Sequence, residues 1–342
     1  MKKIIFIMPN KGFSGAEKVV IQIINGIKDE YDCYYISESG SINLYLNENN
    51  IKHVITKKNL DKKELKKVIN KIKPDIVIAT DFRASVIMSS IKGQYVLISH
   101  LHNNPSWIKK INIKSITYAL ASINFDKIFI VSESIYNEFI FRKLIKNKIH
   151  LVSNPLSRNE ILNEDNFEYE KIYDLSFIGR FCEQKDPEKF IKIVKKMKDN
   201  KCPVKALMMG DGSLKNKVVE WINYYNVEDC IELRDFEKNP FPYFKKSKII
   251  VMPSKFEGFG LVAYESLCFG IPVIACPVGG LVNIIDNRCG YFCTETDDFV
   301  KIIINLLNNK NEYNCKSKGA VEKSVLLDNY NDYIKNIKKY LL

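Results

Sequence analysis

The chain has 342 residues, 46% of them hydrophobic, and a formal net charge of +12. This length predicts two globular domains, and the apolar fraction excludes a disordered chain. No apolar run reaches the roughly 18 residues of a membrane-spanning helix. The N-terminal stretch MKKIIFIMP ends at Pro9 without the small-residue cleavage site of a signal peptide. We therefore expect a soluble, cytoplasmic protein.

The nine cysteines do not indicate a metal site. They include no CxxC pair, and the closest two, Cys289 and Cys293, have no histidine nearby in the sequence. We expect free, buried thiols and no bound metal.

The net charge is concentrated in one segment. Residues 51–150 contain 19 Lys or Arg against 7 Asp or Glu, whereas the rest of the chain holds 33 of each. A general bias toward lysine should spread along the whole chain. A basic segment instead suggests an anionic partner, which could be a membrane surface, a nucleic acid or a polyanionic substrate.

The first half of the chain alternates short apolar runs with amphipathic segments. Helical periodicity predicts helices over 16–27 and 62–72. The apolar runs predict strands at 3–9, 31–37, 75–80, 94–99 and 127–132. This alternation is typical of a parallel sheet covered by helices.

A second alternating set follows a polar segment. Its predicted strands are 173–179, 204–210, 230–235, 248–254 and 271–277. We therefore expect an α/β fold with two tandem, doubly wound, Rossmann-like domains that face an interdomain cleft, where the carboxyl ends of the strands bind ligands. The predicted boundaries are a first domain at 1–160, a linker at 161–171, a second domain at 172–325, and a C-terminal helix at 326–342 that packs back toward the first domain.

The segment SKFEGFGLVAYE, residues 254–265, combines two acids with a glycine-rich turn. Gly258 and Gly260 let backbone amides approach a ligand, and the following helix N-terminus favours anions. The carboxylates of Glu257 and Glu265 repel phosphate and accept hydrogen bonds, so they suit the hydroxyl groups of a ribose or a hexose. The alternative is a helix cap at Glu257 and a solvated Glu265.

Two cations follow the predicted strand that ends at Gly179. Arg180 and Lys185 lie five residues apart around a turn and could converge on one diphosphate. The alternative is surface ion pairing with Glu183 and Asp186. The next predicted strand ends in Gly210 and Asp211, within a GxG turn that is a weak signal for phosphate binding.

Four segments together resemble the retaining, GT-B-fold glycosyltransferases of family 4. They are GRFCEQKDP, MMGDGSL, PSKFEGFGLVAYESLCFGIPVIACPVGG and the N-terminal FSGAEKVV. The resemblance covers nearly the whole chain, and the two glutamates separated by seven residues are its most distinctive element. It implies a nucleotide-diphosphate-sugar donor in the second domain, an acceptor held mainly by the first, and retention of anomeric configuration without a metal or other cofactor.

The resemblance also assigns roles to the donor-binding residues. Glu257 would bind the hydroxyls of the donor sugar, with the amides of Gly258, Phe259 and Gly260 close to the sugar and the phosphates. Glu265 would hold the ribose diol. Arg180 and Lys185 would neutralise the diphosphate as it leaves. The remaining donor-binding positions are Gly15, Gly179, Gly210 and Asp211.

His100 completes the expected catalytic set with Glu257, Arg180 and Lys185. It follows the strand at 94–99, and the resemblance places a histidine of this position near the donor sugar, as a hydrogen-bond partner or as a stabiliser of positive charge. The alternative is a histidine bonded to loop backbone. The resemblance does not require a covalent nucleophile, because the leaving phosphate oxygen can help to deprotonate the acceptor.

The segment from 104 to 125 offers a use for the basic stretch. It mixes Trp107 and isoleucines with Lys109, Lys110 and Lys114, which suits a helix at an anionic bilayer surface. The alternative is a core-facing helix with solvated lysines. We expect these residues to contact the membrane or the acceptor, with peripheral attachment to the inner face of the plasma membrane.

The sequence therefore predicts a retaining glycosyltransferase. Its donor is a nucleotide-diphosphate sugar, with UDP favoured over GDP and ADP, and its acceptor is lipid-linked or a growing cell-surface polysaccharide. The alternatives are a small soluble acceptor or nucleotide-sugar epimerisation. Nucleic-acid binding is not expected, because the chain has no recognition motif for it.

Overall fold

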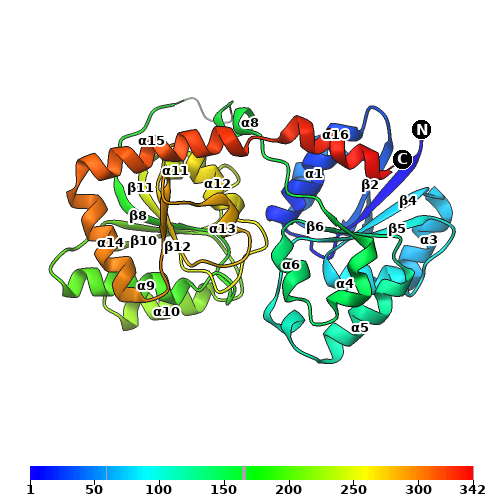
Figure 1. Cartoon of the computed structure of the whole chain (residues 1–342), viewed down its shortest axis with the longest axis horizontal. Helices are drawn as coiled ribbons and strands as arrows, with labels where there is room; N and C mark the ends of the chain where they lie inside the picture. The colour runs from blue at the N-terminus through cyan, green and yellow to red at the C-terminus, as the bar shows by residue number, and fades with distance from the viewer. Residues whose placement is uncertain (59, 164–166, 342) are drawn as a thin grey trace. The chain divides into compact units, whose positions relative to one another are not determined.

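The computed structural model describes residues 1–58, 60–163 and 167–341. Its backbone divides into two compact units, the first made of 1–155 with 329–342 and the second of 156–328. Figure 1 shows both units as sheets covered by helices. The expected α/β class with two Rossmann-like domains is confirmed.

The first unit is built on a seven-stranded parallel sheet with the order β3-β2-β1-β4-β5-β6-β7. Its strands are β1 Lys3–Ile7, β2 Asp32–Glu38, β3 His53–Thr56, β4 Ile76–Thr80, β5 Val96–Leu101, β6 Lys127–Ile130 and β7 Ile149–Leu151. The chain reverses its winding direction between β1 and β4, and ligands bind beyond the strand ends at such a point. The two strands that the sequence did not predict, β3 and β7, are the sheet edges, which are short and partly exposed.

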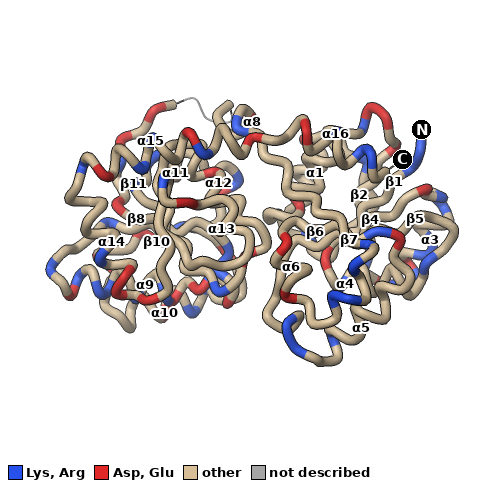
Figure 2. The backbone as a smooth tube through the Cα atoms, in the orientation of Figure 1, with Lys and Arg blue, Asp and Glu red and all other residues tan. Residues whose placement is uncertain are grey.

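Helices cover both faces of this sheet. They are α1 Gly15–Ile27, α2 Ile42–Glu48, α3 Lys62–Ile72, α4 Asp81–Ser89, η1 Ser106–Lys109, α5 Ile113–Ala121, η2 Ser122–Asn124, α6 Glu133–Glu138, α7 Arg142–Ile145, η3 Lys146–Lys148 and α16 Tyr330–Leu341. The buried Val20, Ile23, Ile24 and Ile27 of α1 recur at helical spacing and pack on the sheet. The basic segment 51–150 lies in this unit, and Figure 2 shows Lys and Arg on α3 among other elements.

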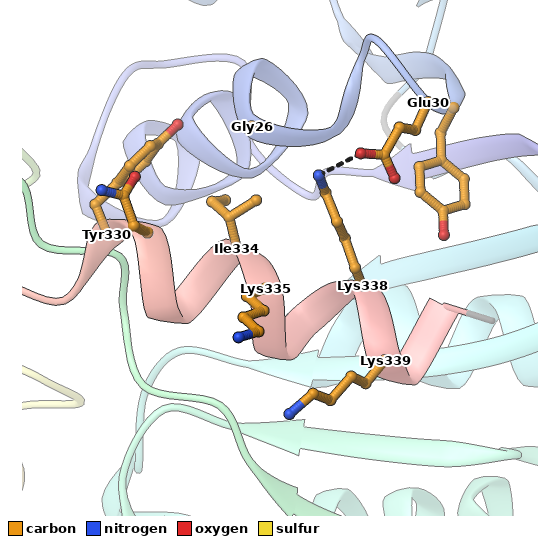
Figure 3. A pocket seen from close by; sticks show the side chains of 9 residues that line it. Gly26, Glu30, Tyr330, Ile334, Lys335, Lys338 and Lys339 are labelled. Atoms are coloured by element: carbon orange, nitrogen blue, oxygen red, sulfur yellow. Dashed lines mark hydrogen bonds and ion pairs between the residues drawn. The ribbon is translucent and has the colours of Figure 1, made fainter.

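The C-terminal helix, expected over 326–342, is α16, and it packs on α1. Ile334 lies over Gly26, and Lys338 Nζ lies 2.6 Å from Glu30 Oε1 (Figure 3). A cavity of about 480 Å³ opens between the two helices. None of the residues predicted to bind donor or acceptor lines this cavity, so we place the candidate site elsewhere.

The second unit has a six-stranded parallel sheet with the order β10-β9-β8-β11-β12-β13. Its strands are β8 Tyr173–Ile178, β9 Ala206–Met209, β10 Ile231–Arg234, β11 Ser247–Met252, β12 Val273–Ala275 and β13 Gly290–Phe292. Its helices are α8 Arg158–Asn163, α9 Pro187–Asp199, α10 Lys215–Tyr224, α11 Phe241–Lys245, α12 Leu261–Cys268, α13 Leu281–Ile284, α14 Thr296–Asn308 and α15 Lys310–Leu327. The winding reverses between β8 and β11, so the loops after these strands form the expected ligand-binding edge.

The boundary between the units lies earlier than the sequence indicated. It falls between Pro155 and Leu156, not at 160, because Leu156 and Ile161 are buried in the core of the second unit. Within the expected linker 161–171, residues 164–166 lie outside the described residues. The segment ahead of them is the short helix α8, whose Arg158 also donates to the Ser324 hydroxyl at 3.2 Å. Among the residues that the structure describes, no helix is long and apolar enough to cross a membrane.

Candidate active site

The candidate site of the second unit centres on an ion pair between two predicted residues. Lys185, in the loop after β8, bonds to Glu257 Oε1, in the loop after β11. Only 15% of the Lys185 side chain and 6% of the Glu257 side chain are exposed. The Ser254 hydroxyl also donates to Glu257 Oε1, at 3.0 Å. The sequence predicted that Lys185 and Glu257 bind different parts of a ligand. In the structure, their side chains instead bond to each other.

The surface ion pairs that the sequence left open for Lys185 are not formed. Its partner is Glu257, and Asp186 instead lies 3.6 Å from Lys255. The Lys255 amide donates to the Gln184 carbonyl at 2.8 Å, which holds the two loops together. Two strands that are neighbours in the sheet thus bring the cation and the acid into one site.

The loop after β9 joins the same edge of the sheet. The Phe181 amide donates to the Asp211 carbonyl at 2.8 Å, so Asp211 lies beside the Arg180 loop. A Cβ atom on Gly210 would lie 1.9 Å from the Gly179 carbonyl oxygen, so only glycine allows this close approach. Arg180 is exposed, and its guanidinium donates to Gln184 Oε1 at 3.3 Å. Gly179, Arg180, Lys185, Gly210 and Asp211 therefore lie on adjoining loops, as a shared phosphate site requires.

The glycine-rich turn after Glu257 leads directly into α12. Gly260 has a φ of 109° at the helix N-cap, a conformation that other residues rarely adopt. Gly258 and Phe259 precede it, so the backbone of all three approaches the helix N-terminus, where the partial positive charge favours anions. Glu265 lies on the second turn of α12 and is 8% exposed. This burial contradicts the alternative of a solvated Glu265.

Gly15 begins α1 in the first unit, next to a loop that is held by a buried acid. Glu17 is fully buried and accepts hydrogen bonds from the Ser14 hydroxyl and, at 3.3 Å, from Asn10 Nδ2. Glu17 was not predicted from the sequence as a site residue. A glutamate in the first turn of a helix is usually solvent-exposed. Only the hydrogen bonds from Ser14 and Asn10 show that Glu17 holds the loop ahead of α1.

His100 lies at the end of β5, as expected, and its imidazole is buried against a second histidine. The rings of His100 and His102 have centroids 4.0 Å apart. Across the described ranges, none of their four ring nitrogens has a hydrogen-bond partner. The alternative of a His100 ring bonded to loop backbone is therefore not observed. Buried polar atoms are usually satisfied, so this pair is a candidate for contact with a ligand.

Burial keeps both histidines neutral. It lowers the pKa of His102 to about 3, and burial together with the neighbouring His102 lowers the pKa of His100 well below its usual value. In the unfolded chain, both imidazoles bind a proton below a pH of about 6.5. The stabilising contribution of the neutral form is therefore complete above pH 6.5 and is lost as the pH falls toward the folded pKa.

We expect the free energy of unfolding to fall between pH 6.5 and pH 5, with His102 accounting for about 2 kcal/mol of the loss. Urea unfolding at both pH values measures this loss, and the His102→Gln variant should show a correspondingly smaller dependence on pH. An equal dependence in the variant and the wild type would show that His102 titrates normally in the folded protein.

The segment predicted to lie on a membrane differs in detail from expectation. It forms η1 and α5 with a break at Lys110–Asn112, instead of one helix. Ile108 is fully buried, and Trp107 packs edge-on against Phe82 at 4.8 Å, so neither is a prominent surface residue. Lys109 pairs with Glu138 at 3.2 Å, whereas Lys110 and Lys114 are exposed.

Comparison with known proteins finds similarity to glycosyltransferases. Residues 158–322 match the sequence profile of the family "Glycosyl transferases group 1". An uncharacterized glycosyltransferase of Methanocaldococcus jannaschii, MJ1059, is 31% identical over 231 residues, which are 61% of this chain and 57% of that relative. The chain thus spans less than two thirds of the length of this relative.

A second relative aligns over most of both chains. It is the Campylobacter jejuni GalNAc-alpha-(1->4)-GalNAc-alpha-(1->3)-diNAcBac-PP-undecaprenol alpha-1,4-N-acetyl-D-galactosaminyltransferase, 25% identical over 91% of this chain and 90% of the relative. Among solved structures, Anabaena HepE in complex with UDP and glucose superimposes with a TM-score of 0.85 at 17% identity, over 100% of this chain and 99% of that chain. Residues 158–322 are thus similar to the group 1 glycosyl transferases, and the fold of the chain is the GT-B fold.

Proposed function

We propose that this protein is a retaining glycosyltransferase that takes a sugar from a nucleotide-diphosphate donor bound in the second unit. The observation that carries the proposal is the Lys185–Glu257 pair, because it places a cation and an acid together at the edge of the sheet where ligands bind. The glycine-rich start of α12 adds backbone amides to the same edge. A nucleotide sugar needs this combination, since it carries a charged diphosphate and neutral hydroxyls.

In the proposed complex Lys185 and Glu257 no longer bond to each other, and each binds a different part of the donor. Lys185 turns toward the diphosphate with Arg180, while Glu257 accepts hydrogen bonds from the sugar hydroxyls and Glu265 from the ribose diol. The acceptor oxygen bonds to the anomeric carbon as the bond to the diphosphate oxygen breaks on the same face. That phosphate oxygen takes the acceptor proton, and the two cations stabilise the charge that develops on the leaving group.

No metal is required in this scheme, because Arg180, Lys185 and the helix amides supply the positive charge. Gly15 and His100 lie in the first unit, and their contacts with the donor remain predictions from the family resemblance. UDP is the favoured donor nucleotide, supported by the UDP complex of HepE. GDP and ADP are the competing nucleotides.

We propose a lipid-linked or growing cell-surface saccharide as the acceptor, used at the inner face of the plasma membrane. This is supported by the undecaprenol-linked substrate in the name of the Campylobacter relative. Transfer from a UDP-sugar to an undecaprenol-linked saccharide, with the product anomer assigned by NMR, tests the proposal. Inverted configuration would contradict the retaining mechanism, and transfer only to small soluble sugars would favour the other acceptor class.

Calorimetric titration of UDP-sugars tests the donor site by itself. We expect Glu265→Ala to weaken binding about tenfold or more, because it removes charge-assisted hydrogen bonds to the ribose. The matched control is Glu220→Ala on α10, an exposed acid of the same unit, which should bind as the wild type does. Unchanged affinity in Glu265→Ala would contradict the ribose contact.

A further inference from the structure

The helix α5 carries apolar side chains on the face that points away from the core. Ile113, Ile116 and Leu120 follow the helical spacing of three and four residues and therefore share one face. Ile111 and Ile123 extend this row at its two ends. These five side chains are between 41% and 84% exposed. We call them the α5 apolar row.

The opposite face of α5 already fills the core of the first unit. Tyr118 is fully buried there, with its hydroxyl 2.9 Å from the Ser99 hydroxyl, and Ala119 is buried beside it. The helix start is fixed by a capping box between Asn112 and Ser115. A helix at a protein surface normally presents charged or polar residues to water. Because α5 is firmly anchored by its inner face, the apolar row is a stable feature of the surface.

Lysines stand at both ends of this row. Lys110 and Lys114 are exposed at the start of α5. At the other end, Lys148 Nζ donates to the Ser122 and Ile123 carbonyls at 2.8 and 2.9 Å. Lys92 Nζ donates to the Asn124 carbonyl at 2.7 Å and pairs with Asp126 at 2.9 Å, so both of these cations are already bonded within the unit. Figure 2 shows Lys and Arg on other elements of this unit as well, so charge alone does not single out α5. The combination of cations with exposed isoleucines does.

We infer that the α5 apolar row inserts into the headgroup region of an anionic lipid bilayer, with the exposed Lys110 and Lys114 on the lipid phosphates. A nucleic acid would use the lysines but would leave the isoleucines exposed to water. An anionic bilayer satisfies both, because apolar side chains enter the acyl boundary while cations remain at the headgroups. The inference rests on the proposed membrane-linked acceptor, and it names the surface that docks.

Sedimentation with vesicles tests this surface directly. The full chain should bind vesicles of equal phosphatidylglycerol and phosphatidylcholine, and should bind pure phosphatidylcholine at least tenfold more weakly. The Ile113→Ser/Ile116→Ser/Leu120→Ser variant should lose at least tenfold in affinity. The matched control Leu44→Ser/Val219→Ser/Leu326→Ser removes the same number of exposed apolar side chains from other elements and should bind as the wild type does.

A second variant tests the exposed lysines and leaves the buried side of α5 unchanged. Lys110→Gln/Lys114→Gln should weaken binding to the anionic vesicles roughly thirtyfold at low salt, and less as the salt concentration rises. Circular dichroism and calorimetric titration with UDP-sugars accompany each variant, so that loss of folding or of the donor site is recognised separately from loss of docking.

Two outcomes would overturn the inference. One is equal binding to anionic and neutral vesicles, or no binding to either, while the affinity for UDP-sugars is intact. That result would support the donor site and would contradict membrane docking by the α5 apolar row. The other is a dimer in sedimentation velocity that the triple serine variant dissociates, which would assign the row to a second copy of the chain. Vesicle binding with no affinity for nucleotide sugars would leave the inference standing and would contradict the proposed function.

Discussion

Replacing Lys185 with alanine should lower the free energy of unfolding by about 3 kcal/mol, because the Glu257 carboxylate would remain buried without its cation. The same change should abolish most of the turnover, since the proposed leaving group loses a stabilising charge. Urea unfolding and sugar transfer measure the two effects. The control is Lys255→Met in the neighbouring loop, whose side chain is 59% exposed and lies 3.6 Å from Asp186, so this ion pair should contribute less than about 1 kcal/mol.

The double variant Lys185→Met/Glu257→Gln separates stability from catalysis. It removes both charges, so the unpaired buried carboxylate no longer exists and much of the lost stability should return. Turnover should not return, because neither the cation nor the acid is present. If Lys185→Ala unfolds at the same urea concentration as the wild type, the pair is not a buried one. If the double variant is active, the assignment of both residues to the site is wrong.

Replacing Gly279 with alanine should disrupt the donor site through the backbone. A Cβ atom at this position would lie 1.6 Å from the Glu257 carbonyl oxygen, and the φ of 54° adds about 1–2 kcal/mol of strain for a residue with a side chain. Because the clash is with backbone, the whole Glu257 loop must move. We expect a lower melting temperature and at least a tenfold loss of UDP-sugar affinity.

Gly12→Ala is the matched control for this substitution. A Cβ atom on Gly12 would lie 4.0 Å from its nearest neighbour, the Ser41 hydroxyl, so the change should leave stability within about 1 kcal/mol of the wild type. Wild-type melting and donor binding in Gly279→Ala would show that the Glu257 loop has a different conformation from the one described.

The sequence predicted the central strands and one edge strand, β10, but missed the other three edge strands. Central strands such as β1 and β11 are buried on both faces and therefore read as continuous apolar runs. The edge strands β3, β7 and β13 are three or four residues long and partly exposed, so they give little pattern. The helix α8 was missed because a six-residue helix with one buried residue, Ile161, has no readable period.

The residues of the donor site could be predicted from the sequence, but the side chains that they contact could not. Glu257, Arg180 and Lys185 follow predicted strands, and their motifs identify them. The pairing of Lys185 with Glu257 joins residues 72 positions apart in the sequence and depends on β8 lying beside β11. Strand order is not visible in local periodicity. The buried Ser254 and the contact of His102 with His100 were missed for the same reason, since burial and contact are properties of the assembled unit.

A crystal structure with bound UDP tests the central claim most directly. The account predicts that the two phosphates contact Arg180, Lys185 and the amides that begin α12, while the ribose hydroxyls contact Glu265 and Glu257 is left facing the place of the sugar. Phosphate oxygens lying against Glu257 and Glu265, or UDP bound away from the loops after β8, β9 and β11, would contradict it.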